Sequence, residues 1–149
     1  MVDSYGGILP DDMIKIIKLV QSKTNIPLGF HGHDNLHMSL INSITAYNHG
    51  CKIVDSTITG MGRGAGNLKT ELLLTYLSSI NKIKVKQYIL GNIVSIFEKM
   101  QKDYGWGTNL PYMFSGANSL PQKEVMDWVS MNRYSFSSIL NALNNKKLV

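Results

Sequence analysis

The feature that most constrains the fold of this chain is a repeated alternation of strand-like and helix-like segments in its first half. Segments that favour short strands begin at residues 2, 28 and 52, about 26 residues apart, and apolar residues at helical spacing follow each one. Strands that alternate with helices in this way are typical of βαβ units, in which each helix carries the chain across to a parallel strand. The sequence therefore predicts an α/β fold with a parallel sheet.

Two helices are predicted between these strands. Pro10 is suited to a first helical position, and Asp34 and Asn35 are favourable N-cap types, which predicts that the second helix begins directly after them. Gly50 is a suitable residue to end it. The apolar face expected for the second helix consists of Leu36, Leu40, Ile44 and Tyr47.

The second half has a different character. Apolar residues at helical spacing predict a helix from residue 86 to about 104, another beginning at Pro121, and a short one over 134–143. Between the first two of these, residues 104–114 combine aromatic residues with glycine, and we expect a loop there that packs on the core. The change near residue 80 indicates two parts, 1–80 and 81–149.

Composition fits one soluble globular chain of ordinary size. It has 149 residues, of which 44% are hydrophobic and 17% charged, enough to form a core. Its one cysteine, Cys51, excludes an intramolecular disulfide framework, and we expect a buried, unreactive thiol in a cytoplasmic protein. No apolar run approaches the roughly 18 residues of a membrane span, and we expect no signal peptide.

The excess of positive over negative charge lies entirely in the second half. Residues 76–149 contain nine Lys/Arg and four Asp/Glu, whereas residues 1–75 contain six of each. The lysines are scattered, and only Lys82, Lys84 and Lys86 cluster. We interpret this half as a solvated surface and expect neither nucleic acid nor a membrane as a partner.

The sharpest chemical feature is His31-Gly32-His33 at the end of the second predicted strand. In an extended chain, residues i and i+2 point to the same side, so both imidazoles would face one spot. Two such ligands form half of a common metal shell, and ligands gather at the carboxyl ends of parallel strands. The alternative is a pair of polar loop histidines.

Polar residues also end the two neighbouring strands. These residues are Asp3-Ser4 and Asp55-Ser56-Thr57. We expect them to lie beside the histidines and to line the bottom of the same site. The glycine-rich loop, residues 60–67, could wrap a ligand closely, but it lacks the context of a dinucleotide fingerprint, so no nucleotide cofactor is expected. Arg63 in this loop could hold a carboxylate with its planar fork, or simply face solvent.

Together these motifs resemble a known enzyme group. Residues 2–7, 29–36 and 55–57, with the glycine-rich loop and Thr70-Glu71, are similar to the DRE-TIM metallolyase (HMGL-like) superfamily, most of all to its 4-hydroxy-2-oxovalerate aldolase branch. The resemblance implies a partial TIM (β/α)8 barrel, comprising the last three βα units over 1–80, with a helical C-terminal extension over 81–149.

The resemblance also implies a metal site. His31 and His33 would be two ligands of a divalent cation, with Mn²⁺ expected and Mg²⁺ or Co²⁺ as substitutes. Asn67 matches an asparagine that joins the metal shell in the lyase branch.

The substrates implied are a small 2-oxo acid and an aldehyde. Ser4 matches a serine that contacts the pyruvate carboxylate, and Tyr112 is a candidate for an active-site tyrosine of the C-terminal region. Arg63 completes the set as a possible substrate contact. The reaction implied is aldolase-type carbon–carbon lyase chemistry through a pyruvate enolate.

The sequence departs from the family in two ways. The glycine-rich loop has no cysteine, unlike that of the lyase branch, and no Asp-Arg-Glu strand motif is present. A barrel needs about 250 residues and eight strands, so we expect the isolated chain to be inactive and to associate with a missing N-terminal part or to form a homo-oligomer.

Two other functions remain open. An acyl-CoA condensing synthase of the isopropylmalate type is one, although Arg63 stands where that branch is expected to have an acidic residue. The other is a non-catalytic interaction module with a vestigial metal site.

Overall fold

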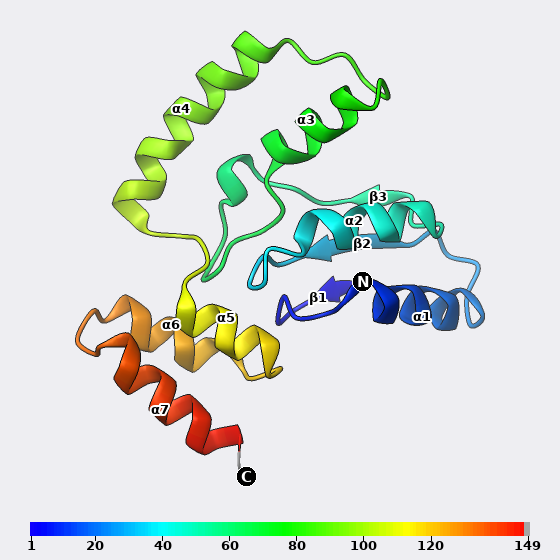
Figure 1. Ribbon diagram of the computed structural model, residues 1–149. Helices are drawn as coiled ribbons and strands as arrows, with labels where there is room; N and C mark the ends of the chain where they lie inside the picture. Colours follow the sequence, from blue (N-terminus) through cyan, green and yellow to red (C-terminus); the bar gives the residue numbers. More distant parts are fainter. Residues whose placement is uncertain (148–149) are drawn as a thin grey trace.

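The computed structural model describes residues 1–147 and contains a small parallel sheet with helices around it (Figure 1). The strand order is β1-β2-β3, and both pairs are parallel. This confirms the predicted α/β class. The strands are β1 (Val2–Asp3), β2 (Gly29–Gly32) and β3 (Ile53–Val54), and the helices between them are α1 (Pro10–Gln21) and α2 (Ser39–Asn48).

One face of the sheet packs against α1 and α2. Phe30 of β2 is 1% exposed and lies between these helices and the sheet. Cys51 joins the same cluster, which confirms the expected burial, and burial raises the pKa of its thiol. A protonated, buried thiol is a poor nucleophile. The first core consists of Met13, Ile17, Phe30, Ala46 and Cys51.

The opposite face of the sheet is open. Val2 pairs with His31, and Gly29 pairs with Ile53. Because side chains alternate along a strand, Val2, His31 and Ile53 share the face that Phe30 does not use. Val2 is 58% and Ile53 60% exposed, which is unusual for apolar residues of parallel strands.

Helix α2 begins later than the sequence predicts. It starts at Ser39, because the Asp34 carboxylate accepts hydrogen bonds from the backbone N–H and the hydroxyl of Ser39. The residues before Ser39 therefore form a turn. His37, expected in the helix, has a φ of +57° and lies in that turn.

The predicted apolar face of α2 is only partly buried. Leu36, Leu40 and Ile44 are half-buried, Tyr47 is 63% exposed, and the fully buried residues of the helix are small or polar. Small side chains at the buried positions let α2 approach α1 and the sheet closely. The buried set is Ser39, Asn42, Ser43 and Ala46.

The rest of the described chain is helical. The expected helices are present, but the segment predicted as a loop contains an additional one, α5 (Leu110–Ala117). The side chain of Asn109 caps α5 by accepting the Tyr112 N–H at 3.1 Å, and Pro111 lies in its first turn. The remaining elements are η1 (Ile58–Gly60), α3 (Thr70–Ser79), α4 (Gln87–Tyr104), α6 (Gln122–Ser130) and α7 (Phe136–Lys147).

Helices α5, α6 and α7 group together, away from α3 and α4 (Figure 1), around a second core. Ala65 of the glycine-rich loop belongs to that core, which consists of Ala65, Tyr112, Val125, Ile139 and Leu143. The C-terminal helices therefore pack directly on the loop. No helix among residues 1–147 is long and apolar enough to cross a membrane.

Two glycines bring the sheet end and α5 very close together. A Cβ atom on Gly7 would collide with the backbone carbonyl of Gly116, and one on Gly116 would lie 2.7 Å from the Cβ of Asn35. Glycine is the residue that permits such backbone approach.

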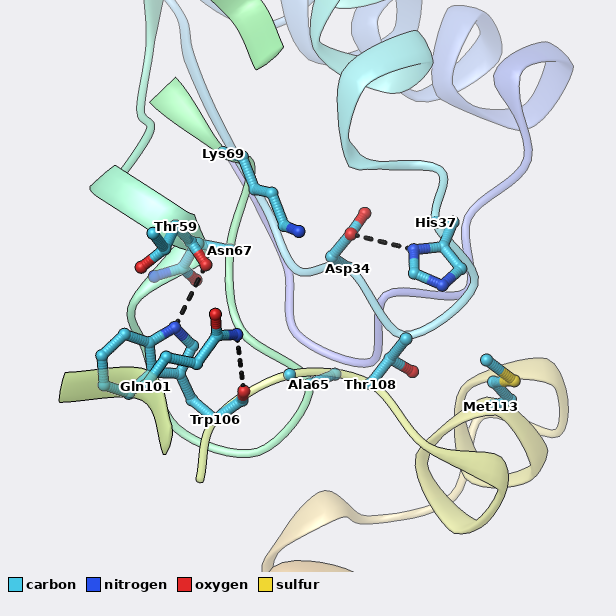
Figure 2. A pocket seen from close by; sticks show the side chains of 12 residues that line it. Asp34, His37, Thr59, Ala65, Asn67, Lys69, Gln101, Trp106, Thr108 and Met113 are labelled. Carbon is cyan, nitrogen blue, oxygen red and sulfur yellow. Dashed lines mark hydrogen bonds and ion pairs between the residues drawn. The ribbon is translucent and has the colours of Figure 1, made fainter. Parts of the chain in front are cut away.

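A strap, residues 105–109, joins α4 to α5 and crosses the glycine-rich loop (Figure 2). The Trp106 indole N–H donates to the Thr59 carbonyl at 3.1 Å. The Gly107 N–H donates to the Gly64 carbonyl at 3.0 Å. The strap thus connects the C-terminal helices to the loop by backbone as well as side-chain hydrogen bonds.

Candidate metal and substrate site

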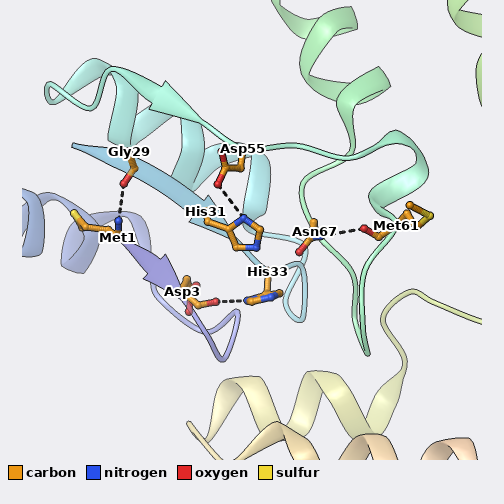
Figure 3. A network of polar contacts seen from close by, with 8 residues as sticks. All are labelled: Met1, Asp3, Gly29, His31, His33, Asp55, Met61 and Asn67. Carbon is orange, nitrogen blue, oxygen red and sulfur yellow. Dashed lines mark hydrogen bonds and ion pairs between the residues drawn. The ribbon is translucent and has the colours of Figure 1, made fainter. Parts of the chain in front are cut away.

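The structure brings His31 and His33 side by side at the carboxyl end of β2. Their ring centroids are 5.0 Å apart, with the ring planes at 80° (Figure 3). Side chains alternate between the two faces of an extended strand, so His31 and His33 share one face and Gly32 occupies a position on the other.

Each ring uses its Nδ1 atom for a contact within the chain. His31 Nδ1 lies 3.2 Å from Asp55 Oδ2, and His33 Nδ1 lies 2.8 Å from the backbone carbonyl of Asp3 (Figure 3). A carboxylate and a carbonyl can only accept hydrogen bonds, so both contacts favour the tautomer protonated on Nδ1. Each Nε2 atom is then left with its lone pair, which is the form that binds a metal.

Asn67 lies next to this pair. It forms an isolated antiparallel bridge with His33, and its Nδ2 donates to the Met61 carbonyl at 3.0 Å. That bond orients the amide, and Oδ1 makes no hydrogen bond with the described residues 1–147, so it remains available as an acceptor (Figure 3). Two imidazole nitrogens and an amide oxygen suit a first-row divalent cation.

This donor set is incomplete by itself. Within residues 1–147, no group of three or more His, Cys, Asp or Glu side chains is arranged to hold a metal ion. The residues present therefore fit part of a metal shell, namely two neutral nitrogens and one neutral oxygen. An anionic ligand would have to come from elsewhere.

The other predicted residues line a separate, open groove of about 1430 Å³. Ser4, Arg63 and Tyr112 all border it, although they come from three distant segments. His31 and His33 do not line the groove, but Ser4 directly follows Asp3, whose carbonyl contacts His33. Ser4 therefore connects the edge of the groove, through the backbone, to the residue that contacts His33.

Sequence reasoning missed the residue that ties these segments together. Asn35 is 2% exposed, and its amide donates to the Tyr112 carbonyl at 3.0 Å and to Gln122 Oε1 at 2.9 Å. Its own carbonyl accepts from the Thr108 hydroxyl at 2.8 Å. Asn35 was expected only as an N-cap, because no sequence signal links it to partners more than 70 residues away.

The sequence predicts which residues lie near the histidines but not which atoms contact each ring. Asp3 and Asp55 were expected near the histidines, and the structure gives each of them a defined contact with one ring. The carboxylate of Asp3 has a second task, since it accepts the N–H groups of Gly7 and Ile8 and so holds the turn after β1.

Known proteins share these features. Residues 1–97 match the HMGL-like protein family. The chain belongs to the HMGL-like family. The match covers all three strands, the histidine pair and the glycine-rich loop.

Two curated relatives of this chain are named after specific reactions. A 4-hydroxy-2-oxovalerate aldolase from Pectobacterium atrosepticum is 46% identical over 74 residues, which is 50% of this chain and 22% of that protein. An oxaloacetate decarboxylase from Mycobacterium tuberculosis is 38% identical over 77 residues, 52% of this chain and 23% of the relative. The chain therefore spans about a quarter of the length of these proteins.

A solved structure resembles nearly the whole chain. The N-terminal domain of a candidate aldolase from Bacteroides vulgatus is 58% identical, with a TM-score of 0.84. The likeness covers 95% of this chain and 46% of that one. The HMGL-like part and the C-terminal helices thus occur together in a known domain.

The first prediction concerns the buried Tyr112 of this HMGL-like chain. Desolvation raises the pKa of its phenol above the usual value of 10.0, so the neutral form is favoured in the folded state. Its contribution to stability is complete below pH 10 and is lost as the pH rises through the raised pKa. Tyr112→Phe should therefore flatten the fall in unfolding free energy between about pH 9 and 11. Urea unfolding across this range measures the difference, and Tyr104→Phe, at an exposed site, should not change the slope.

The second prediction concerns the histidine tautomers. We expect the neutral rings of both His31 and His33 to carry the proton on Nδ1, because each Nδ1 has an acceptor. Nitrogen-15 NMR of the metal-free chain reads the tautomers directly. Asp55→Ala should shift His31 toward the Nε2-protonated form and leave His33 unchanged. Nε2 protonation of both rings in the unsubstituted chain would contradict the assigned geometry.

Proposed function

We propose that this chain is part of a divalent-metal-dependent lyase that breaks a carbon–carbon bond of a 2-oxo acid. The observation that carries this proposal is the His31–His33 pair, whose Nδ1 atoms are both taken by acceptors within the chain. Such a pair presents two unprotonated nitrogens at the carboxyl end of parallel strands, where enzymes with this architecture bind their ligands.

The choice of reaction is supported by the names of the relatives. 4-Hydroxy-2-oxovalerate and oxaloacetate, after which two of them are named, are both 2-oxo acids. Aldol cleavage of the first and decarboxylation of the second both break the bond between C3 and C4 and leave pyruvate as its enolate. One site that stabilises this enolate would therefore serve either reaction.

A cation would be held by Nε2 of His31 and His33 and by Oδ1 of Asn67. We propose Mn²⁺, with Mg²⁺ and Co²⁺ as substitutes, since these ions accept mixed nitrogen and oxygen ligands. When bound, the cation supplies Lewis acidity toward the oxygen that gains negative charge.

The residues of the groove would bind and orient the substrate. We assign the Ser4 hydroxyl and the Arg63 guanidinium to the carboxylate, because both are exposed at the groove and the guanidinium fork matches a carboxylate. The raised pKa of Tyr112 keeps its proton on Oη throughout the neutral range, so this residue offers a hydrogen-bond donor at the same groove.

The open sheet face supports a partial barrel. The exposed side chains of Val2 and Ile53 lie on the same face as His31, where further strands of a TIM barrel would cover them. We therefore assign residues 1–80 to the last three βα units and 81–149 to an extension, in a cytoplasmic enzyme. The remaining strands would come from an N-terminal part of the protein or from another copy of the chain.

Oxaloacetate decarboxylation is the second candidate, and the relative from Mycobacterium tuberculosis favours it. The two candidates differ in the fragment released from C4, which is an aldehyde in the first case and carbon dioxide in the second.

The third prediction tests the metal site. The chain should bind Mn²⁺ weakly, and His31→Ala and His33→Ala should each lower the affinity at least about tenfold, because each removes one of two nitrogen ligands. Electron paramagnetic resonance of free Mn²⁺ measures the affinity. His49→Ala is the matched control, since His49 contacts Thr45 on α2, away from the pair. Unchanged binding in both variants would disprove the assignment, and no binding at all would favour a non-catalytic module.

The fourth prediction tests the reaction in the protein joined to its complete barrel. With Mg²⁺ present, we expect pyruvate to exchange its methyl protons with deuterium, and Arg63→Ala to slow the exchange at least about tenfold, because a charged hydrogen bond to the carboxylate is lost. Proton NMR follows the exchange. Assays for aldehyde from 4-hydroxy-2-oxovalerate and carbon dioxide from oxaloacetate then separate the two candidates. Absence of both products and of exchange would refute the proposed lyase.

A further inference from the structure

Thr59 has a backbone conformation that its residue type disfavours. Its φ is +52° and its ψ is +17°, in the left-handed region, and it is 4% exposed. A β-branched residue in this region is strained, and such strain persists only where the surroundings hold the backbone. The contacts of Thr59 therefore identify what maintains this turn.

Two residues from outside the turn hold the backbone of Thr59. Its N–H donates to Glu71 Oε2 of α3 at 3.0 Å, and its carbonyl accepts the Trp106 indole N–H at 3.1 Å. Both backbone groups are thus fixed by side chains from later segments. Trp106 is itself held, because Gln101 Nε2 of α4 donates to its carbonyl at 2.9 Å.

The turn at Thr59 is coupled directly to Asn67. The next residue, Gly60, accepts the Asn67 N–H on its carbonyl at 3.0 Å. A Cβ atom on Gly60 would lie 2.8 Å from the Asn67 carbonyl, so the two ends of the glycine-rich loop meet backbone to backbone. A shift of residues 59–60 must therefore move Asn67.

On its other side, Asn67 is joined to the histidine strand. The Asp34 N–H donates to the Gly66 carbonyl at 3.0 Å, and the Leu68 N–H donates to the Gly32 carbonyl at 3.2 Å. Asn67 therefore lies between the strand that carries the histidines and the turn that Trp106 holds.

The loop packs on the C-terminal helices at Ala65, but less closely at its Asn67 end. A cavity of about 310 Å³ lies there, and Thr59, Asn67, Gln101 and Trp106 all line it (Figure 2). Where a cavity replaces close packing, a hydrogen bond contributes a larger share of the force that fixes the loop.

We propose that Trp106 is a positioning residue through which the C-terminal helices hold Asn67 beside His33. The metal-binding consequence rests on the proposed function, whereas the mechanical coupling from Trp106 to the loop does not. Trp106 acts on Asn67 through Thr59 and Gly60, and it also lines the groove that borders Ser4, Arg63 and Tyr112, so its effect on metal affinity is measured without substrate.

The test replaces Trp106 by Phe, which keeps an aromatic ring but removes the indole N–H. Trp128→Phe is the matched control, because Trp128 is the other tryptophan and packs against the second core from α6. Amide hydrogen exchange of residues 60–67 should be about three- to tenfold faster in Trp106→Phe, as expected for the loss of one hydrogen bond, and unchanged in Trp128→Phe.

Mn²⁺ affinity gives the second readout. It should fall about three- to tenfold in Trp106→Phe, with His31 and His33 retaining their tautomers. In an Asn67→Ala background, Trp106→Phe should have no further effect, because its influence passes through Asn67. General destabilisation would lower the affinity equally in both backgrounds, and that result would overturn the proposal.

The outcomes separate this inference from the proposed function. If the chain binds no Mn²⁺, the lyase proposal fails, but loop exchange still decides whether Trp106 holds the loop. Unchanged exchange in Trp106→Phe would overturn the coupling. If that variant does not fold, Gln101→Ala tests the same contacts from α4, where alanine is a good helix former, and it too should accelerate exchange in residues 60–67.

Discussion

The hydrogen bonds made by the Nδ1 atoms of His31 and His33 are the interactions on which the candidate site depends. The strand brings the two rings to one side, but only these bonds fix which nitrogen keeps a lone pair. They also join three neighbouring strands, because Asp3 ends β1 and Asp55 follows β3. The contacts that join the ends of the three strands therefore also determine the tautomers of the two histidines.

The open face of the sheet carries both polar and apolar side chains. Toward the carboxyl ends of the strands it presents imidazole and carboxylate groups, while Val2 lies level with His31 and Ile53 lies level with Gly29, two residues earlier on β2. An apolar interior below a polar mouth is the usual division of a parallel barrel. The exposed apolar side chains of Val2 and Ile53 thus lie on the same face as the two histidines.

The βα alternation and the histidine spacing could be predicted because they depend on residues close together in sequence. Helix α2 could not, because the Asp34 carboxylate bonds to Ser39 and delays the helix, and because its buried face is small and polar. Helix α5 had local signals in Asn109 and Pro111, but the glycines and aromatic residues before it suggested a loop. The roles of Asn35 and Trp106 depend on partners 47 to 87 residues away, which no local pattern reveals.

The contact between Gly7 and Gly116 has a consequence for how such sequences can vary. Neither position can accept even a methyl group without moving α5 away from the turn after β1. The position of α5, whose Tyr112 lines the open groove, is therefore coupled to two sites that carry no side chain. Divergence at either glycine would require compensating changes elsewhere in the C-terminal helices, so the two halves of the chain must evolve as one unit.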